Sequence, residues 1–98
     1  MAGAAHILLG LLPAVPFSNR SPLRMSPENV SVEIGRRLRA RRKSLGLTLA
    51  EVATTCGVSL QLIQKYETAA SVISVPMLLR VGRSLGVRTS YFFEGLED

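Results

Sequence analysis

The chain has 98 residues, of which 47% are hydrophobic and 19% are charged, and it contains one Cys and one His. This length supports one small domain and excludes a multidomain enzyme. A single Cys and a single His exclude a disulfide framework and a zinc site built from Cys and His alone. The formal net charge of +5 indicates a polyanionic partner, either nucleic acid or an anionic membrane surface.

Residues 1–30 differ in composition from the rest of the chain. Four prolines interrupt residues 13–27, and no helical or strand periodicity persists there. The apolar run over residues 7–15 is shorter than the roughly 20 residues of a membrane span, and no basic segment precedes it, as it would in a secretory signal. We predict a disordered N-terminal extension over residues 1–30. The alternatives are a signal peptide, an internal translation start at Met25 and membrane attachment through residues 7–15.

Residues 31–95 carry the start and stop signals of five helices. Hydroxyl-bearing residues that can cap a helix precede each apolar period, and glycines follow several of them. No segment alternates in the manner of a strand, so the predicted fold class is all-α. In chain order, the five helices are expected to start at the caps Ser31, Thr48, Ser59, Ser74 and Thr89, and the first four to end near Ser44, Gly57, Thr68 and Gly86.

The connection between the second and third predicted helices is the most informative local feature. Three residues, Gly57-Val58-Ser59, are too few for comfortable antiparallel packing and favour a bend of about 90–120°. Gly57 can supply the positive φ of such a turn. The cluster expected behind the bend comprises Val52, Cys56, Val58, Ile63 and Tyr66. This combination is typical of a helix-turn-helix.

Several short motifs add to this pattern through their order and spacing. They are Ile34-Gly35-Arg36-Arg37-Leu38-Arg39 with Arg42, Gly46-Leu47-Thr48, Glu51-Val52-Ala53, Gly57-Val58-Ser59, Ile63-Gln64-Lys65-Tyr66-Glu67, Ile73-Ser74, and Leu85-Gly86-Val87 with Tyr91-Phe92-Phe93. Together they resemble the phage repressor and Cro-like helix-turn-helix family, the xenobiotic-response-element type of transcriptional regulator. The resemblance implies a compact five-helix, lambda-repressor-like DNA-binding domain. It also implies a cytoplasmic regulator, a repressor, that binds double-stranded DNA as a homodimer.

The helix predicted over residues 59–68 is the expected reader of the major groove. Its polar positions point away from the apolar pair Ile63 and Tyr66, and the N-terminal part of such a helix meets base edges. Glutamine can form a bidentate contact with adenine, lysine can reach guanine or a phosphate, and leucine can pack on a thymine methyl group. The alternative is an ordinary solvated face. The predicted base-reading residues are Leu60, Gln61, Gln64 and Lys65.

Half of the 12 Lys and Arg residues fall within residues 36–43. Cations on a helix beside the reading helix are candidates for phosphate contacts, although such a cluster is often only a solvated face. The resemblance implies a different role for Arg42, which is expected to pair with Glu67 inside the domain. The predicted phosphate contacts are Arg36, Arg37, Arg39, Lys43, Thr48 and Ser59.

The sequence departs from the family pattern at several positions. Leu49 replaces a glutamine that commonly donates to a phosphate, and Val72 replaces a basic residue. Ala69 stands where relatives often have a glycine with positive φ, so either Ala69 is strained or the helix continues through Ala70. Leu60 and Leu62 make the reading helix unusually apolar. These departures motivate an alternative function, a protein-interaction module such as an antitoxin or adaptor.

No catalytic constellation is evident in the sequence. His6 has no Cys or carboxylate near it, and Cys56 follows the buried period of its helix. The glycines form neither a dinucleotide fingerprint nor a phosphate loop. We therefore expect no enzyme activity, no cofactor, no metal site and no small-molecule ligand. The expected dimer surface comprises Leu79, Tyr91, Phe92 and Phe93.

Overall fold

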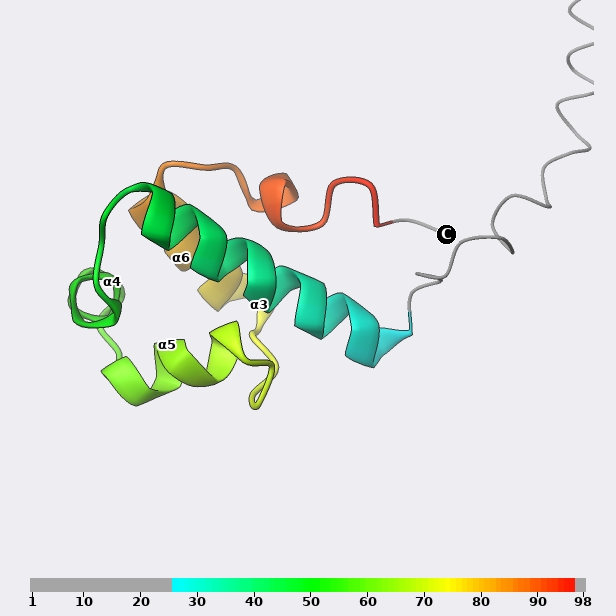
Figure 1. Cartoon of the computed structure of the whole chain (residues 1–98), viewed down its shortest axis with the longest axis horizontal. Coiled ribbons are helices and arrows are strands. Elements are labelled where there is room, and N and C mark those ends of the chain that lie inside the picture. Colours follow the sequence, from blue (N-terminus) through cyan, green and yellow to red (C-terminus); the bar gives the residue numbers. More distant parts are fainter. Residues whose placement is uncertain (1–25, 97–98) are drawn as a thin grey trace, which may run out of the picture.

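The computed structural model describes residues 26–96, which form four α-helices and one 3₁₀ turn and contain no strand. Helix α3 (Pro27–Ser44) runs through the middle of Figure 1, with α4 (Leu49–Cys56) at its C-terminal end. Helix α5 (Leu60–Glu67) lies along one side of α3, η1 (Thr89–Phe92) lies on the other side, and α6 (Val75–Leu85) lies behind. The all-α prediction is confirmed for these residues. The expectations for residues 1–25 lie outside the described residues.

Helix α3 starts earlier than the sequence analysis predicted. Ser26, not Ser31, is its N-cap, and the Ser26 hydroxyl accepts a hydrogen bond from the Asn29 amide at 3.1 Å. Pro27 fits the first helical turn because its missing N–H has no intrahelical partner there. The predicted helix start at Ser31 is therefore wrong, and α3 begins before the predicted domain boundary at residue 30. Pro27 does not interrupt a helix, because directly after a serine cap it fits the first turn.

The three central helices start and end as predicted. Thr48 and Glu51 form a reciprocal capping box, in which the Thr48 hydroxyl accepts from the Glu51 amide at 3.0 Å and the Glu51 carboxylate accepts from the Thr48 amide at 2.8 Å. Ser59 and Ser74 cap α5 and α6 through hydrogen bonds from the third amide of each helix. These caps satisfy amides that have no partner inside the helix.

The predicted fifth helix is only a 3₁₀ turn. Arg88 precedes η1, and no side chain caps it, so Thr89 lies inside the turn instead of capping it. The segment is short, and its position is set by Phe92, whose side chain is fully buried against the body of the domain. Short 3₁₀ turns are common where packing fixes a segment too short for a stable α-helix.

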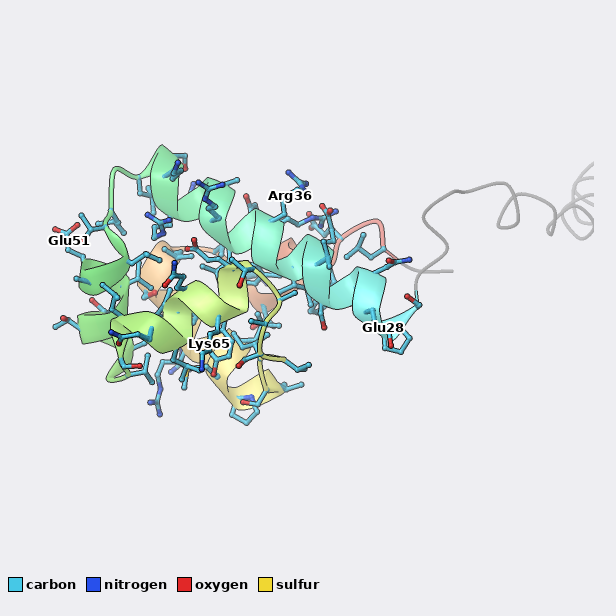
Figure 2. All side chains as sticks on the ribbon, turned by 60° about the horizontal axis from the view of Figure 1, so that its bottom comes forward. Glu28, Arg36, Glu51 and Lys65 are labelled. Carbon is cyan, nitrogen blue, oxygen red and sulfur yellow. The ribbon has the colours of Figure 1, made fainter. Side chains whose placement is uncertain are left out.

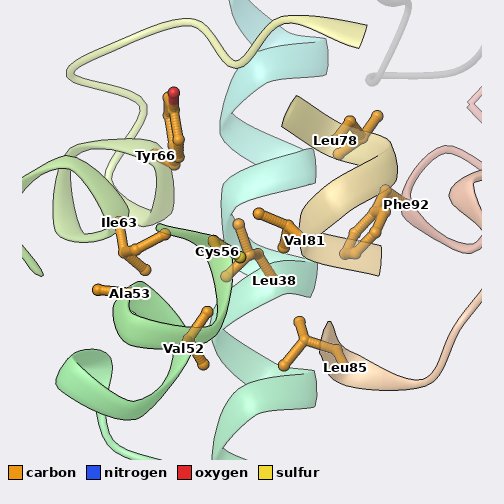
Figure 3. Packing of buried hydrophobic residues seen from close by; sticks show 10 residues of the cluster. All are labelled: Leu38, Val52, Ala53, Cys56, Ile63, Tyr66, Leu78, Val81, Leu85 and Phe92. Carbon is orange, nitrogen blue, oxygen red and sulfur yellow. The ribbon is translucent and has the colours of Figure 1, made fainter. Parts of the chain in front are cut away.

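The hydrophobic core draws on all five elements (Figure 3). Helix α3 contributes one fully buried side chain, and α4, α5, α6 and η1 surround it. Val58, predicted to lie in the cluster behind the corner, is half-buried and packs against the core. The core residues are Leu38, Val52, Ala53, Cys56, Ile63, Tyr66, Leu78, Val81, Leu85 and Phe92.

Candidate nucleic-acid interface

The corner between α4 and α5 sets the direction of the candidate reading helix. Gly57 ends α4 with a φ of +73°, in the left-handed region that favours glycine. A Cβ atom at this position would meet nothing within 4 Å, so the backbone conformation, not space, requires the glycine. The Val58 amide donates to the Ala53 carbonyl at 3.0 Å, and Ser59 caps the next helix. In Figure 1, α4 is seen end-on while α5 is seen lengthwise, so the two helices meet at a steep angle.

Helix α5 has one buried side and one exposed side. Ile63 and Tyr66 are buried in the core, and Leu62 is half-buried against it. On the exposed side, Leu60 lies one helical turn from Gln64, and Gln61 lies one turn from Lys65. Figure 2 shows Lys65 on the outer surface. Solvent reaches all four predicted base-reading residues, which are Leu60, Gln61, Gln64 and Lys65.

The C-terminal end of α5 is joined to α3 by a buried ion pair between Arg42 and Glu67. The Arg42 Nε and Nη2 atoms lie 2.6 and 2.9 Å from the two Glu67 carboxylate oxygens, and Arg42 Nη1 donates to the Leu47 carbonyl at 2.9 Å. The side chains of Arg42 and Glu67 are only 9% and 4% exposed. The hydrogen bond to Glu67 raises the pKa of Arg42, so the guanidinium stays charged. This is the internal pair that the family resemblance implied.

Gly35 allows α5 to approach the backbone of α3 closely. A Cβ atom at Gly35 would lie 2.5 Å from the Tyr66 carbonyl oxygen and 2.7 Å from that of Glu67. Sequence reasoning did not assign this role. The available signal was an isolated glycine inside a helix, which often marks a close backbone approach.

The end of α5 resolves the two alternatives for Ala69. Ala69 adopts a φ of +63°, and the helix ends at Glu67 instead of continuing through Ala70. The amides of Ala69 and Ala70 donate to the carbonyls of Tyr66 and Lys65 at 3.2 and 2.8 Å. This is the hydrogen-bond pattern of a Schellman motif, in which glycine is the favoured residue at the position of Ala69.

Besides Arg42, three more arginines of the α3 cluster have hydrogen-bond partners within the domain. Arg36 Nε and Arg37 Nε donate to the Glu33 carboxylate at 3.0 and 2.9 Å, and these hydrogen bonds lower the pKa of Glu33 to about 2. Arg37 also donates to the backbone carbonyls of Tyr91 and Glu94, at 3.3 and 2.8 Å. Arg41 donates to a backbone carbonyl at the end of α6, at 2.9 Å. The phosphate contacts predicted for Arg36 and Arg37 stay predictions. Arg36 is 64% exposed beside Glu33, whereas Arg37 also joins the C-terminal segment to α3.

Arg39 and Lys43 remain available for an external anion. Both are exposed, they lie one turn apart on α3, and within residues 26–96 neither has a hydrogen-bond or ion-pair partner. Thr48 and Ser59 are also exposed at the N-termini of α4 and α5. The candidate interface thus combines the exposed side of α5 with two free cations and two cap hydroxyls.

The expected dimer surface needs one correction. Phe92 is 0% exposed, so its side chain belongs to the core and cannot contact a second protein. Its ring packs edge-to-face with that of Tyr91, which is half-buried. Leu79 and Phe93 are exposed and remain candidates.

Within the described part of the chain, other types of site have little support. No group of three or more His, Cys, Asp or Glu side chains there is arranged to hold a metal ion. Cys56 is buried, with its sulfur 3.7 Å from the Ser84 hydroxyl. None of the described helices is long and apolar enough to cross a bilayer.

A family model described as a helix-turn-helix domain matches residues 33–90. The chain is 41% identical over 69 residues to a transcriptional regulator in the ATPase CF(0) region of Rhodospirillum rubrum, and the match covers 70% of this chain and 64% of that protein. It is 35% identical over 69 residues to an HTH-type transcriptional regulator of Sinorhizobium fredii, covering 70% of this chain and 48% of the relative. The chain thus spans about half to two-thirds of the length of these relatives, which are named as regulators and not as enzymes.

Among solved structures, the crystal structure of the restriction-modification controller protein C.AhdI from Aeromonas hydrophila is similar, with a TM-score of 0.62. The match covers 63% of this chain and 94% of the controller, at 24% sequence identity. At that identity the likeness concerns the fold alone.

Proposed function

The chain belongs to the helix-turn-helix domain family, and from this premise we propose that it binds double-stranded DNA as a transcriptional regulator. The observation that carries the proposal is the exposed side of α5, which is held by a buried ion pair at one end and is open to solvent along its length. A helix of this kind fits the major groove, where base edges are distinguishable.

In this proposal three residues of α5 read bases. Gln61 forms the bidentate contact with an adenine, Lys65 reaches a guanine or a phosphate, and Leu60 packs on a thymine methyl group. Lys43 and the hydroxyls of Thr48 and Ser59 bind phosphates of the DNA backbone on either side of the groove. These contacts orient the domain without carrying sequence information.

We also propose that the protein is a cytoplasmic repressor that acts as a homodimer. Two copies related by a twofold axis would place their α5 helices about 34 Å apart, in successive major grooves. Leu79 and Phe93 supply exposed apolar surface for the dimer contact. Occupation of a promoter by such a dimer excludes the transcription machinery.

Selection of bound duplexes from a random pool, followed by gel shifts at two salt concentrations, tests DNA binding. The expected result is one enriched sequence, bound in a salt-sensitive manner. Gln61→Ala should remove the preference at one adenine position, at a cost of about 1–3 kcal/mol in binding free energy. Arg83→Ala, which removes an exposed cation from α6, serves as the control and should leave the base preference unchanged.

The alternative function, an antitoxin or adaptor that binds a partner protein, is favoured only by the exposed Leu60. Leu49 and Leu62, which also motivated it, are half-buried and pack against the core. The absence of any shifted duplex at micromolar protein would favour the adaptor over the regulator.

A further inference from the structure

We infer that Arg39 and Gln64 together bind one phosphate group of the DNA backbone, in the cleft where α3, α4 and α5 meet. This inference rests on the proposed function, because duplex DNA is the ligand. In this inference Gln64 contacts a phosphate of the DNA backbone, whereas the sequence predicts that Gln64 contacts a base.

The cleft has a volume of about 380 Å³. Its most buried lining is the ion pair of Arg42 and Glu67, in which the two charges neutralise each other. An anion that enters the cleft therefore meets no uncompensated negative charge. The complete lining is Arg39, Arg42, Leu49, Gln64, Glu67 and Thr68.

Two exposed side chains of this lining can supply hydrogen-bond donors to a ligand. The side chains of Arg39 and Gln64 are both exposed, and neither side chain has a hydrogen-bond or ion-pair partner within residues 26–96. The Thr68 hydroxyl is engaged with the Gln64 backbone carbonyl at 3.1 Å, and Leu49 is apolar. The free groups are thus a guanidinium, which only donates, and an amide, which can donate.

A phosphate diester is the anion that this pair fits best. The planar guanidinium of arginine can donate two parallel hydrogen bonds to phosphate oxygens. Gln64 lies three residues from Gln61 and four from Leu60, so the cleft lies one helical turn from the proposed base readers. A helix in the major groove lies beside the phosphates that border the groove, and the cleft is the surface next to α5 on its α3 side.

The same geometry separates Gln64 from the base readers. Its side chain lines a cleft shared with α3 and α4, and the base readers are then Leu60, Gln61 and Lys65. The two glutamines of α5 would have different tasks: Gln61 selects a sequence, and Gln64 stabilises every complex equally.

The first experiment compares the salt dependence of binding for two arginine variants, with the duplex that the wild-type protein selects from a random pool. Arg39→Ala should reduce the slope of log affinity against log salt concentration by about 0.9, the value for one lost phosphate contact. Arg41→Ala is the matched control, because Arg41 is on the same helix but donates to the Leu85 carbonyl. Its slope should match that of the wild type, and Arg39→Lys should restore most of the lost slope.

The second experiment compares the two glutamines on the selected duplex and on a scrambled duplex. Gln64→Ala should weaken binding to both duplexes by the same factor, whereas Gln61→Ala should weaken mainly the selected one. Thermal melting of each variant provides the folding check, and these exposed residues should leave the melting temperature unchanged.

The outcomes separate the two proposals. If the wild-type protein selects no duplex, DNA binding and the phosphate site are both rejected. If it selects a duplex but Arg39→Ala and Arg41→Ala give equal slopes, or Gln64→Ala changes the preference at one base position, only the phosphate site is rejected.

Discussion

The two ends of α5 are held in very different ways. At the C-terminal end, Glu67 is buried in an ion pair with Arg42, the backbone rests on Gly35, and a Schellman motif closes the helix at Ala69. At the N-terminal end, Ser59 provides a single cap and the first residues are exposed. The C-terminal end is therefore held by direct contacts with α3, whereas the N-terminal end is held by the corner with α4 and its first residues are open to solvent. This arrangement allows stability and recognition to be altered separately.

The largest expected effect comes from breaking the ion pair at the anchored end. Arg42→Ala would leave the Glu67 carboxylate buried without a partner, and we expect a loss of about 4 kcal/mol in the free energy of unfolding. Urea denaturation measures this change. Arg41→Ala is the control, because it removes a half-buried arginine of α3 that donates to one backbone carbonyl, and it should cost about 1 kcal/mol. Equal losses for the two variants would contradict the anchoring role of Arg42.

Gly35→Ala should have the next largest effect. The new methyl group would collide with the Tyr66 and Glu67 carbonyls, so α5 must shift away from α3 at a cost of about 2–3 kcal/mol in unfolding free energy. Gly82→Ala on α6 is a milder control, since its Cβ would lie 3.0 Å from the nearest backbone atom, the Val87 oxygen. A Gly35→Ala protein as stable as the wild type would show that α5 does not rest on the α3 backbone.

Ala69→Gly should strengthen the anchored end. Glycine adopts the observed positive φ without the steric cost that alanine incurs, so we expect a gain of about 1 kcal/mol in the free energy of unfolding. Ala70→Gly is the matched control, because Ala70 does not have a positive φ, and it should give no gain. Thermal denaturation of the two variants distinguishes a relief of backbone strain from a general effect of glycine in this loop.

The smallest effect is expected at Glu33, whose ion pairs with Arg36 and Arg37 lie within α3. Its folded-state pKa of about 2 lies below the ordinary value of 4.5, so its stabilisation is present above pH 4.5 and is lost as the pH falls towards 2. Arg36 is mostly exposed and solvent screens its pair, so Glu33→Gln should cost about 1 kcal/mol or less at neutral pH.

Chemical denaturation of Glu33→Gln and the wild type over a pH series checks this prediction. The difference between them should shrink as the pH falls from 4.5 to 2. Glu28→Gln removes a carboxylate from the same helix and is the control, for which no such change is expected. A difference that stays constant with pH would show that the Glu33 ion pairs contribute nothing.

Some features of the fold and site could be predicted because they depend on neighbours in the sequence. The capping box of Thr48 and Glu51 and the corner at Gly57 are local hydrogen-bond patterns, and both were predicted correctly. The exposed side of α5 follows from the spacing of Ile63 and Tyr66. The predicted start of α3 was wrong because proline breaks a helix interior but fits a first turn, and the sequence signals conflict at Pro27. The predicted cap at Thr89 was wrong because the buried Phe92 sets the position of η1.

The sequence by itself thus determined the central helices, their caps and the exposed side of α5, since each depends on residues three or four positions apart. Only the tertiary structure decided that Arg37 and Arg41 bind backbone carbonyls of other segments. The carbonyls that bind Arg37 and Arg41 belong to Tyr91, Glu94 and Leu85, more than forty residues away in the chain. Spacing along one helix cannot reveal such partners, because they come within hydrogen-bonding distance only when the C-terminal segment packs against α3.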